Sequence, residues 1–127
     1  SLSKSCSKVD IRACFHAFGG DFEELYGRIP NENLIRKLLL RFPEDPSWQD
    51  IGQALEEDRR EAAFRSAHNL KGLCLNLSFT QLYRSSSALT EALRPGSDAD
   101  DQHIRQLYEV LTRDYRNILT TIEAFKE

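Results

Sequence analysis

The chain contains 127 residues, of which 40% are hydrophobic and 29% are charged, and its formal net charge at pH 7 is −3. These values are typical of one globular domain with a single hydrophobic core. The small negative charge argues against binding to nucleic acid, which requires a basic surface, and no apolar run approaches the roughly 20 residues of a membrane span. We therefore expect one domain over residues 1–127, with a flexible N-terminal segment over residues 1–8.

The beginning of the chain and its cysteines favour a cytoplasmic protein. Residues 1–5 lack the apolar core of a signal peptide. The three cysteines, Cys6, Cys14 and Cys74, are odd in number and fit no Cys-x-x-Cys spacing, so we interpret them as reduced thiols. Cys74 falls on an apolar helix face, where a cysteine acts as a small buried hydrophobe.

The sequence predicts a succession of helices, and no segment shows the alternating pattern of a β-strand. Each predicted helix follows a residue that favours the N-cap position. These N-cap residues are, in chain order, Asp10, Asp21, Asn31, Asp45, Asp58, Ser78, and Ser97 or Asp98. Some of them form a capping box with a Glu or Gln three residues later, and these pairs are Asp21–Glu24, Asp58–Glu61 and Ser78–Gln81.

The first four predicted helices are short and cover residues 11–18, 22–28, 32–42 and 46–57. Pro43 and Pro46 separate the third helix from the fourth, since proline interrupts a helix but is favoured at its first position. The third helix carries an apolar stripe that we expect to face inward and that begins with Leu34 and Ile35.

The fifth helix, which runs to about Leu77, carries the residue on which the functional interpretation depends. At about 100° per residue, its apolar residues fall on one side, and they are Ala63, Ala67, Leu70, Cys74 and Leu77. His68 lies roughly opposite this core face, so its imidazole should meet solvent. Lys71 and Gly72 follow at i+3 and i+4, the positions that share the face of His68.

The combination of His68, Lys71 and Gly72 predicts a chemical role. Glycine in a helix interior costs about 1 kcal/mol relative to alanine, and Gly72 is on the wet face, where close helix packing does not explain it. A missing side chain beside an exposed imidazole leaves room for a bulky group, and the Lys71 ammonium can meet an anion. Because a neutral imidazole is a nucleophile, these residues indicate a histidine that accepts a phosphoryl group from a large partner.

Two further amphipathic helices are predicted before the end of the chain. The sixth has an apolar stripe from Phe79 to Leu93, and the Pro-Gly pair at residues 95 and 96 stops it. The seventh keeps its stripe from Ile104 to Phe125. Short turns between successive helices favour antiparallel neighbours. We therefore expect an all-α fold, an up-and-down antiparallel four-helix bundle whose short N-terminal helices cover one end.

The residues around His68 resemble the histidine-containing phosphotransfer (HPt) domains of bacterial phosphorelays. In that family the accepting histidine lies in a motif A-H-x-x-K-G, which is followed after a few residues by N-L-G. The matching residues here are Ala67, His68, Lys71 and Gly72, followed by Asn76, Leu77 and Ser78. The resemblance implies that His68 is the phosphoacceptor, that Lys71 positions the phosphate and that Gly72 provides steric access. It implies the same helical-bundle architecture.

Two residues depart from the family pattern. Ser78 replaces the usual glycine, in the turn after the helix. Thr90 stands where many members carry a Glu or Gln that hydrogen-bonds the histidine ring, so that Glu91 or water would have to take this role.

The resemblance also implies the partners. His68 would accept a phosphoryl group from the aspartyl phosphate of a receiver domain and pass it to another receiver aspartate, so the expected partners are response-regulator receivers and a (hybrid) sensor histidine kinase. The sequence has no P-loop, Gly-rich nucleotide loop or cluster of metal ligands. We therefore expect a monomeric phosphoryl carrier that is not an enzyme and has no cofactor of its own, with Mg²⁺ held by the receiver. Phe64 at i−4 and Leu75 at i+7 share the side of His68, and we expect them to dock the receiver.

Two other classes remain open on the sequence alone. One is the phosphoacceptor and dimerisation domain of a sensor histidine kinase, in which an acidic residue usually follows the histidine, whereas Asn69 follows it here. The other is a helical protein-interaction module in which His68 is inert.

Overall fold

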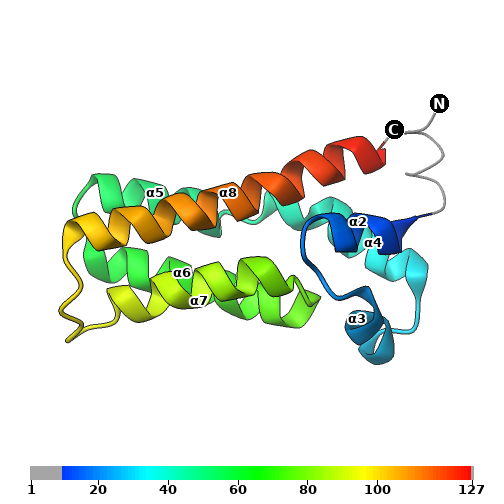
Figure 1. Cartoon of the computed structure of the whole chain (residues 1–127), viewed down its shortest axis with the longest axis horizontal. Coiled ribbons are helices and arrows are strands. Elements are labelled where there is room, and N and C mark those ends of the chain that lie inside the picture. Colours follow the sequence, from blue (N-terminus) through cyan, green and yellow to red (C-terminus); the bar gives the residue numbers. More distant parts are fainter. Residues whose placement is uncertain (1–9, 127) are drawn as a thin grey trace.

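The computed structural model of the protein describes residues 10–126, and these residues form helices and connecting turns without a β-strand (Figure 1). The expectation of an all-α protein is therefore confirmed. The flexible segment expected at residues 1–8, which includes Cys6, lies outside the described residues. The helices are α2 (Ile11–Ala17), α3 (Phe22–Arg28), α4 (Glu32–Arg41), the 3-10 helix η1 (Phe42–Glu44), α5 (Ser47–Glu56), α6 (Arg60–Leu77), α7 (Thr80–Leu93) and α8 (Asp101–Lys126).

The longer helices run side by side. Helices α5, α6, α7 and α8 follow the long dimension of the molecule, and α2, α3 and α4 gather at one end of it (Figure 1). Helix α6 packs against α5 and α7, and α7 also packs against α8. Both α2 and α4 contact α8. Helix α6, which carries His68, is thus held along its length by two neighbours.

Helix α6 buries the face that the sequence predicts. Ala63, Ala67, Leu70 and Cys74 are fully buried, and Leu77 is 7% exposed. Burial raises the pKa of the Cys74 thiol, which therefore stays neutral and acts as a small hydrophobe. The buried stripe fixes the rotation of α6 about its axis, and so decides which residues the helix presents to solvent.

Aromatic side chains join the short helices to the start of α7. Phe15 and Phe18 contact Phe79, with ring centroids 5.6 and 5.0 Å apart, and Phe22 packs edge-on against Phe15 at 5.6 Å. Phe42 of η1 reaches the same Phe79 ring at 5.0 Å. Edge-to-face pairs of this kind stabilise a fold by about 0.5–1.5 kcal/mol each beyond the burial of their area. The cluster therefore anchors the end of the molecule at which α6 stops and α7 begins.

Three predicted N-caps are confirmed by hydrogen bonds in the first helical turn. The side-chain oxygens of Asp10, Asp21 and Asn31 accept from the backbone N–H groups of Ala13, Glu24 and Leu34 at 3.0, 3.0 and 3.1 Å. Each bond gives an acceptor to a backbone N–H group that has none within the helix, and so stabilises the start of the helix. The capping box predicted for Asp21 and Glu24 is incomplete, because the Asp21 N–H donates to the Ser78 carbonyl at 2.8 Å and not to Glu24.

The capping boxes predicted at Asp58 and Ser78 are wrong, because both residues close the preceding helix. Their φ angles are 59° and 57°, in the left-handed region that commonly ends a helix. The Asp58 N–H donates to the Leu55 carbonyl at 3.2 Å, and the Ser78 N–H donates to the Leu75 carbonyl at 3.3 Å. Helices α6 and α7 begin two residues after these positions, without a side-chain hydrogen bond at the N-cap.

The predicted starts of α8 and α5 are shifted. Helix α8 begins after Asp100, whose carboxylate accepts from the His103 N–H at 2.8 Å, and not after Ser97 or Asp98. The Ser97 hydroxyl is used within the turn, where it accepts from the Ala99 N–H at 3.2 Å. In α5 the proline at residue 46 is itself the N-cap, one residue later than predicted.

Leu34 is not inward, so this prediction is wrong. Its exposed fraction is 42%, whereas Ile35 and Leu39 are buried. Successive residues of a helix are about 100° apart, and the stripe that faces the core passes through Ile35 and Leu39. Leu34 therefore lies at the outer edge of that stripe, on the solvent side.

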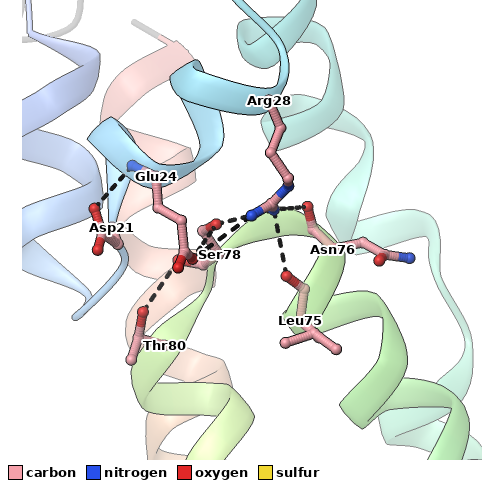
Figure 2. Close-up of polar contacts among 7 residues, drawn as sticks. All are labelled: Asp21, Glu24, Arg28, Leu75, Asn76, Ser78 and Thr80. Atoms are coloured by element: carbon pink, nitrogen blue, oxygen red, sulfur yellow. Dashed lines mark hydrogen bonds and ion pairs between the residues drawn. The ribbon is translucent and has the colours of Figure 1, made fainter.

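Side chains of α3 hold the C-terminal end of α6. The Arg28 guanidinium donates to the carbonyls of Asn76 and Leu75 at 2.6 and 3.4 Å and to the Ser78 hydroxyl at 3.0 Å (Figure 2). The Ser78 hydroxyl donates in turn to the Glu24 carboxylate at 2.7 Å. A cation at this position satisfies free carbonyls of the last turn and complements the helix dipole. Helix α3 thus stabilises the end of the helix that carries His68.

Candidate functional site

His68 lies near the middle of α6, and its side chain is exposed, as the periodicity predicts. The imidazole lies beside the Phe64 ring, with centroids 6.2 Å apart and planes inclined by 27°. Among residues 10–126 no side chain forms a hydrogen bond with the ring. The imidazole is therefore open to approach, and no hydrogen bond from another described residue holds its nitrogen atoms.

Gly72 leaves an open space one turn further along the same face. A β-carbon added at this glycine would have no heavy atom within 4 Å outside its own stretch of α6. By contrast, a β-carbon at Gly52 in α5 would come to 2.5 Å from the Tyr108 hydroxyl oxygen. Close helix packing can explain Gly52, but it does not explain Gly72.

Lys71 is less exposed than the sequence suggests. Its side chain is 24% exposed and crosses from α6 toward α7, where its Nζ is 4.0 Å from a carboxylate oxygen of Glu91. Lys71 was expected on the solvent-facing side of α6 that carries His68, and the structure corrects this expectation to a partly buried side chain. At 4.0 Å the contact is an ion pair without a hydrogen bond, so the ammonium is held only weakly.

Glu91 pairs with Lys71 and with Arg94 at the end of α7, whereas the sequence pointed to Glu91 only as a possible partner of the His68 ring and did not point to Arg94. Arg94 donates a hydrogen bond to each carboxylate oxygen of Glu91, from Nε at 3.0 Å and from Nη2 at 2.7 Å. This pair holds the pKa of the Glu91 carboxyl below its ordinary value, with a smaller contribution from Lys71, so Glu91 is an anion at neutral pH. The Arg94 guanidinium also lies over the Phe64 ring, 5.3 Å from its centroid. The i, i+3 spacing of Glu91 and Arg94 was the available signal in the sequence.

Thr90 forms no hydrogen bond with His68. It is fully buried, and its hydroxyl donates to the Ser86 carbonyl at 2.7 Å. Thr90 is therefore a buried residue of α7 whose hydroxyl is used within its own helix. No described residue takes over the hydrogen bond to the ring, and both carboxylate oxygens of Glu91 are bound by Arg94 instead.

The two predicted docking residues differ in exposure. Phe64 is half-buried and packs partly on the core, while Leu75 is 57% exposed. Leu75 is seven residues after His68, which corresponds to roughly 10 Å along the helix axis. The structure therefore places Phe64 directly beside the imidazole and Leu75 farther along the same helix.

The described residues offer no candidate metal site. Among residues 10–126 no group of three or more His, Cys, Asp or Glu side chains is arranged to hold a metal ion. Within the same range, no helix is both long and apolar enough to cross a membrane.

The comparison with protein families identifies the chain. The family described as Hpt domain matches residues 35–124, a range that contains most of α4 and α8 and all of α5 to α7, with every site residue discussed above. No curated protein and no solved structure matches the sequence. Hpt domains are histidine phosphotransfer modules of phosphorelays, and they interact with receiver domains and kinases. The chain belongs to the Hpt domain family.

Proposed function

We propose that His68 is the phosphoacceptor of this Hpt domain. In this proposal it receives a phosphoryl group from the aspartyl phosphate of one receiver domain and passes it to the aspartate of another. The observation that carries the proposal is the exposed His68 imidazole beside the empty space at Gly72. The family requires an accessible histidine, and among the described residues His16 and His103 are exposed too but lie on α2 and α8, outside the motif.

The transfer is a displacement at phosphorus. The lone pair of the unprotonated ring nitrogen forms the P–N bond, the bond between phosphorus and the aspartate oxygen breaks, and the aspartate carboxylate leaves with its electron pair. The reverse displacement by a second aspartate regenerates the neutral imidazole. No oxidant, reductant or water is consumed, so the transfer can run in both directions, as a relay requires.

The remaining residues would position the reactants. Lys71 would move from Glu91 toward the phosphoryl oxygens, and Gly72 would leave room for the receiver to reach the ring. Phe64 and Leu75 would contact the receiver surface. The Mg²⁺ that stabilises the charge of the transferred group would come with the receiver, so that this chain supplies only the nucleophile and the docking surface.

We also propose the finer architecture. The contacts between α5, α6, α7 and α8 and the short turns that join them favour an up-and-down four-helix bundle within a single domain over residues 1–127. In this arrangement α2 and α3 cover one end. We further propose a monomer that acts in the cytoplasm together with receivers and a hybrid sensor kinase.

The experiment is phosphate uptake from a ³²P-labelled receiver. The wild type should acquire acid-labile, alkali-stable label, and His68→Gln should abolish it while the urea denaturation curve stays nearly unchanged. His16→Gln and His103→Gln are matched controls, because they remove other exposed histidines, and both should label normally. Label in His68→Gln would refute the assignment, and a wild type without label would favour the interaction module with an inert histidine.

A further inference from the structure

Three charged side chains meet where α7 packs against α6, and one of them, Lys71, follows His68 by three residues on α6. The Glu91 carboxylate contacts both Arg94 and Lys71. Both cations lie near the same oxygen of Glu91, Arg94 Nη2 at 2.7 Å and Lys71 Nζ at 4.0 Å. The two cations therefore compete for one anion.

The geometry favours Arg94 in this competition. Its guanidinium donates from Nε to the second carboxylate oxygen as well, at 3.0 Å, which makes a two-point contact. Two parallel charge-assisted hydrogen bonds are stronger and more directional than a single contact to an ammonium. Lys71 is left at the outer limit of an ion pair, close enough to be attracted and too far to donate a hydrogen bond.

Arg94 also contacts an aromatic residue of the site. It is the C-cap residue of α7, and its guanidinium lies over the Phe64 ring at 5.3 Å. A guanidinium over an aromatic face gains a further electrostatic attraction. Phe64 in turn lies beside the His68 ring. The arginine that binds Glu91 therefore also packs on Phe64, the aromatic neighbour of the imidazole.

We propose that Glu91 and Arg94 are positioning residues that control the availability of Lys71 to the phosphoryl group. Glu91 competes with the phosphoryl group for the Lys71 ammonium, and Arg94 weakens this competition by engaging both oxygens of Glu91. This inference rests on the proposed function of His68. It adds that uptake of phosphate by His68 depends on a balance between two cations and one carboxylate on the neighbouring helix.

The effect of each substitution follows from this balance. Glu91→Gln should raise the rate of phosphate uptake because it releases Lys71, and Arg94→Ala should lower the rate because Glu91 then turns to Lys71. We expect factors of about two to five, the range that corresponds to a solvent-exposed ion pair. Arg94→Lys should give an intermediate rate, since it keeps the charge but loses the two-point contact.

The test is a double-mutant cycle, measured with two phosphate donors. One donor is the labelled receiver, and the other is phosphoramidate, a small donor that needs no docking surface. In the Glu91→Gln background, Arg94→Ala should no longer slow uptake from either donor. In the Lys71→Ala background, Glu91→Gln should no longer accelerate it. Glu123→Gln is a matched control, because Glu123 pairs with Lys126 at 3.8 Å on α8, away from the site, and its substitution should not change the rate.

Additive effects would overturn the inference. An Arg94→Ala defect that persists in the Glu91→Gln background would show that Arg94 acts through Phe64 or through docking. An acceleration by Glu91→Gln that persists without Lys71 would show direct repulsion of the phosphoryl group by the carboxylate. In both cases His68 would still be labelled, which separates this failure from a failure of the proposed function, in which His68 takes no label at all.

Discussion

Replacement of Gly72 by alanine should stabilise the fold and impair phosphotransfer. Gly72 lies well inside α6 in ordinary helical conformation, since it is not among the glycines with positive φ, and an added β-carbon meets no atom within 4 Å outside its own helix. Neither strain nor a clash therefore opposes the substitution. What remains is the higher helix propensity of alanine and the lower entropy of the unfolded chain, which together add up to about 1 kcal/mol to the free energy of unfolding.

The same methyl group should slow phosphate uptake. Position 72 is one turn from His68 on the same face, so a side chain there occupies part of the space through which the receiver approaches the imidazole. Gly72→Leu or Gly72→Gln should be tolerated by the fold and should impair uptake more than Gly72→Ala. Stability and activity would thus change in opposite directions.

The assay is urea denaturation of each variant together with its rate of phosphate uptake from a labelled receiver. Gly27→Ala is a matched control, because Gly27 is also helical and has no atom within 4 Å of an added β-carbon, but it lies on α3. It should raise stability without changing uptake. A Gly72→Ala protein that is clearly less stable than the wild type would show that the glycine serves close packing, and the access explanation would then be refuted.

Two further substitutions separate roles in the site from roles in the fold. Lys71→Ala should change the free energy of unfolding by less than about 0.5 kcal/mol and should slow phosphate uptake. Lys37→Ala, which removes an exposed lysine of α4, is the control and should alter neither quantity. Equal uptake rates in Lys71→Ala and the wild type would exclude Lys71 from the site. Phe64→Ala should weaken receiver binding, measured by titration calorimetry, and should lower the free energy of unfolding less than Phe79→Ala does. Phe79 is only 1% exposed, so its replacement by alanine should lower the free energy of unfolding by about 3–5 kcal/mol. A loss of that size in Phe64→Ala would show that Phe64 belongs to the core.

The rotation of α6 could be predicted from sequence because burial repeats with the period of the helix. A stripe of apolar residues three and four positions apart requires only local geometry to be recognised, and Ala67 and Leu70 are buried as that geometry demands. The exposed positions of His68 and Gly72 follow from the same phase. Leu34 shows the limit of this argument, since a leucine at the margin of a stripe can be exposed when no helix covers that side.

The ends of the helices were harder to predict, for a specific physical reason. Short polar residues favour the N-cap of a helix, but aspartate and asparagine also tolerate the left-handed conformation that closes one. Asp10 and Asp21 occupy the first kind of position, and Asp58 occupies the second. Ser78 takes the same left-handed conformation, although serine does not share the tolerance of aspartate for it. The two cases look alike in sequence when one helix follows directly on another, because the closing residue of the first helix stands beside the opening residue of the next.

The partners of Lys71 could not be derived from spacing. Glu91 is 20 residues away along the chain and comes within reach only because α7 packs along α6 in one register. That register depends on the burial of many side chains at once, among them Phe79 and Leu82 at the start of α7. The Glu91–Arg94 pair is visible as an i, i+3 spacing, but its position beside His68 is a property of the packed helices and not of either helix alone.

The helices before the matched range contribute to the site through the end of α6. The family match begins at residue 35, so α2 and α3 lie outside it. Yet Arg28 of α3 donates to carbonyls in the last turn of α6, and Phe15 and Phe18 cover the Phe79 ring that follows it. The last turn of a helix otherwise depends on water or on its own residues to satisfy these carbonyls, and it frays more readily for that reason. Leu75, which we expect a receiver to contact, lies in that turn. The N-terminal helices therefore stabilise the helical conformation of this part of α6, although none of their described contacts is with His68.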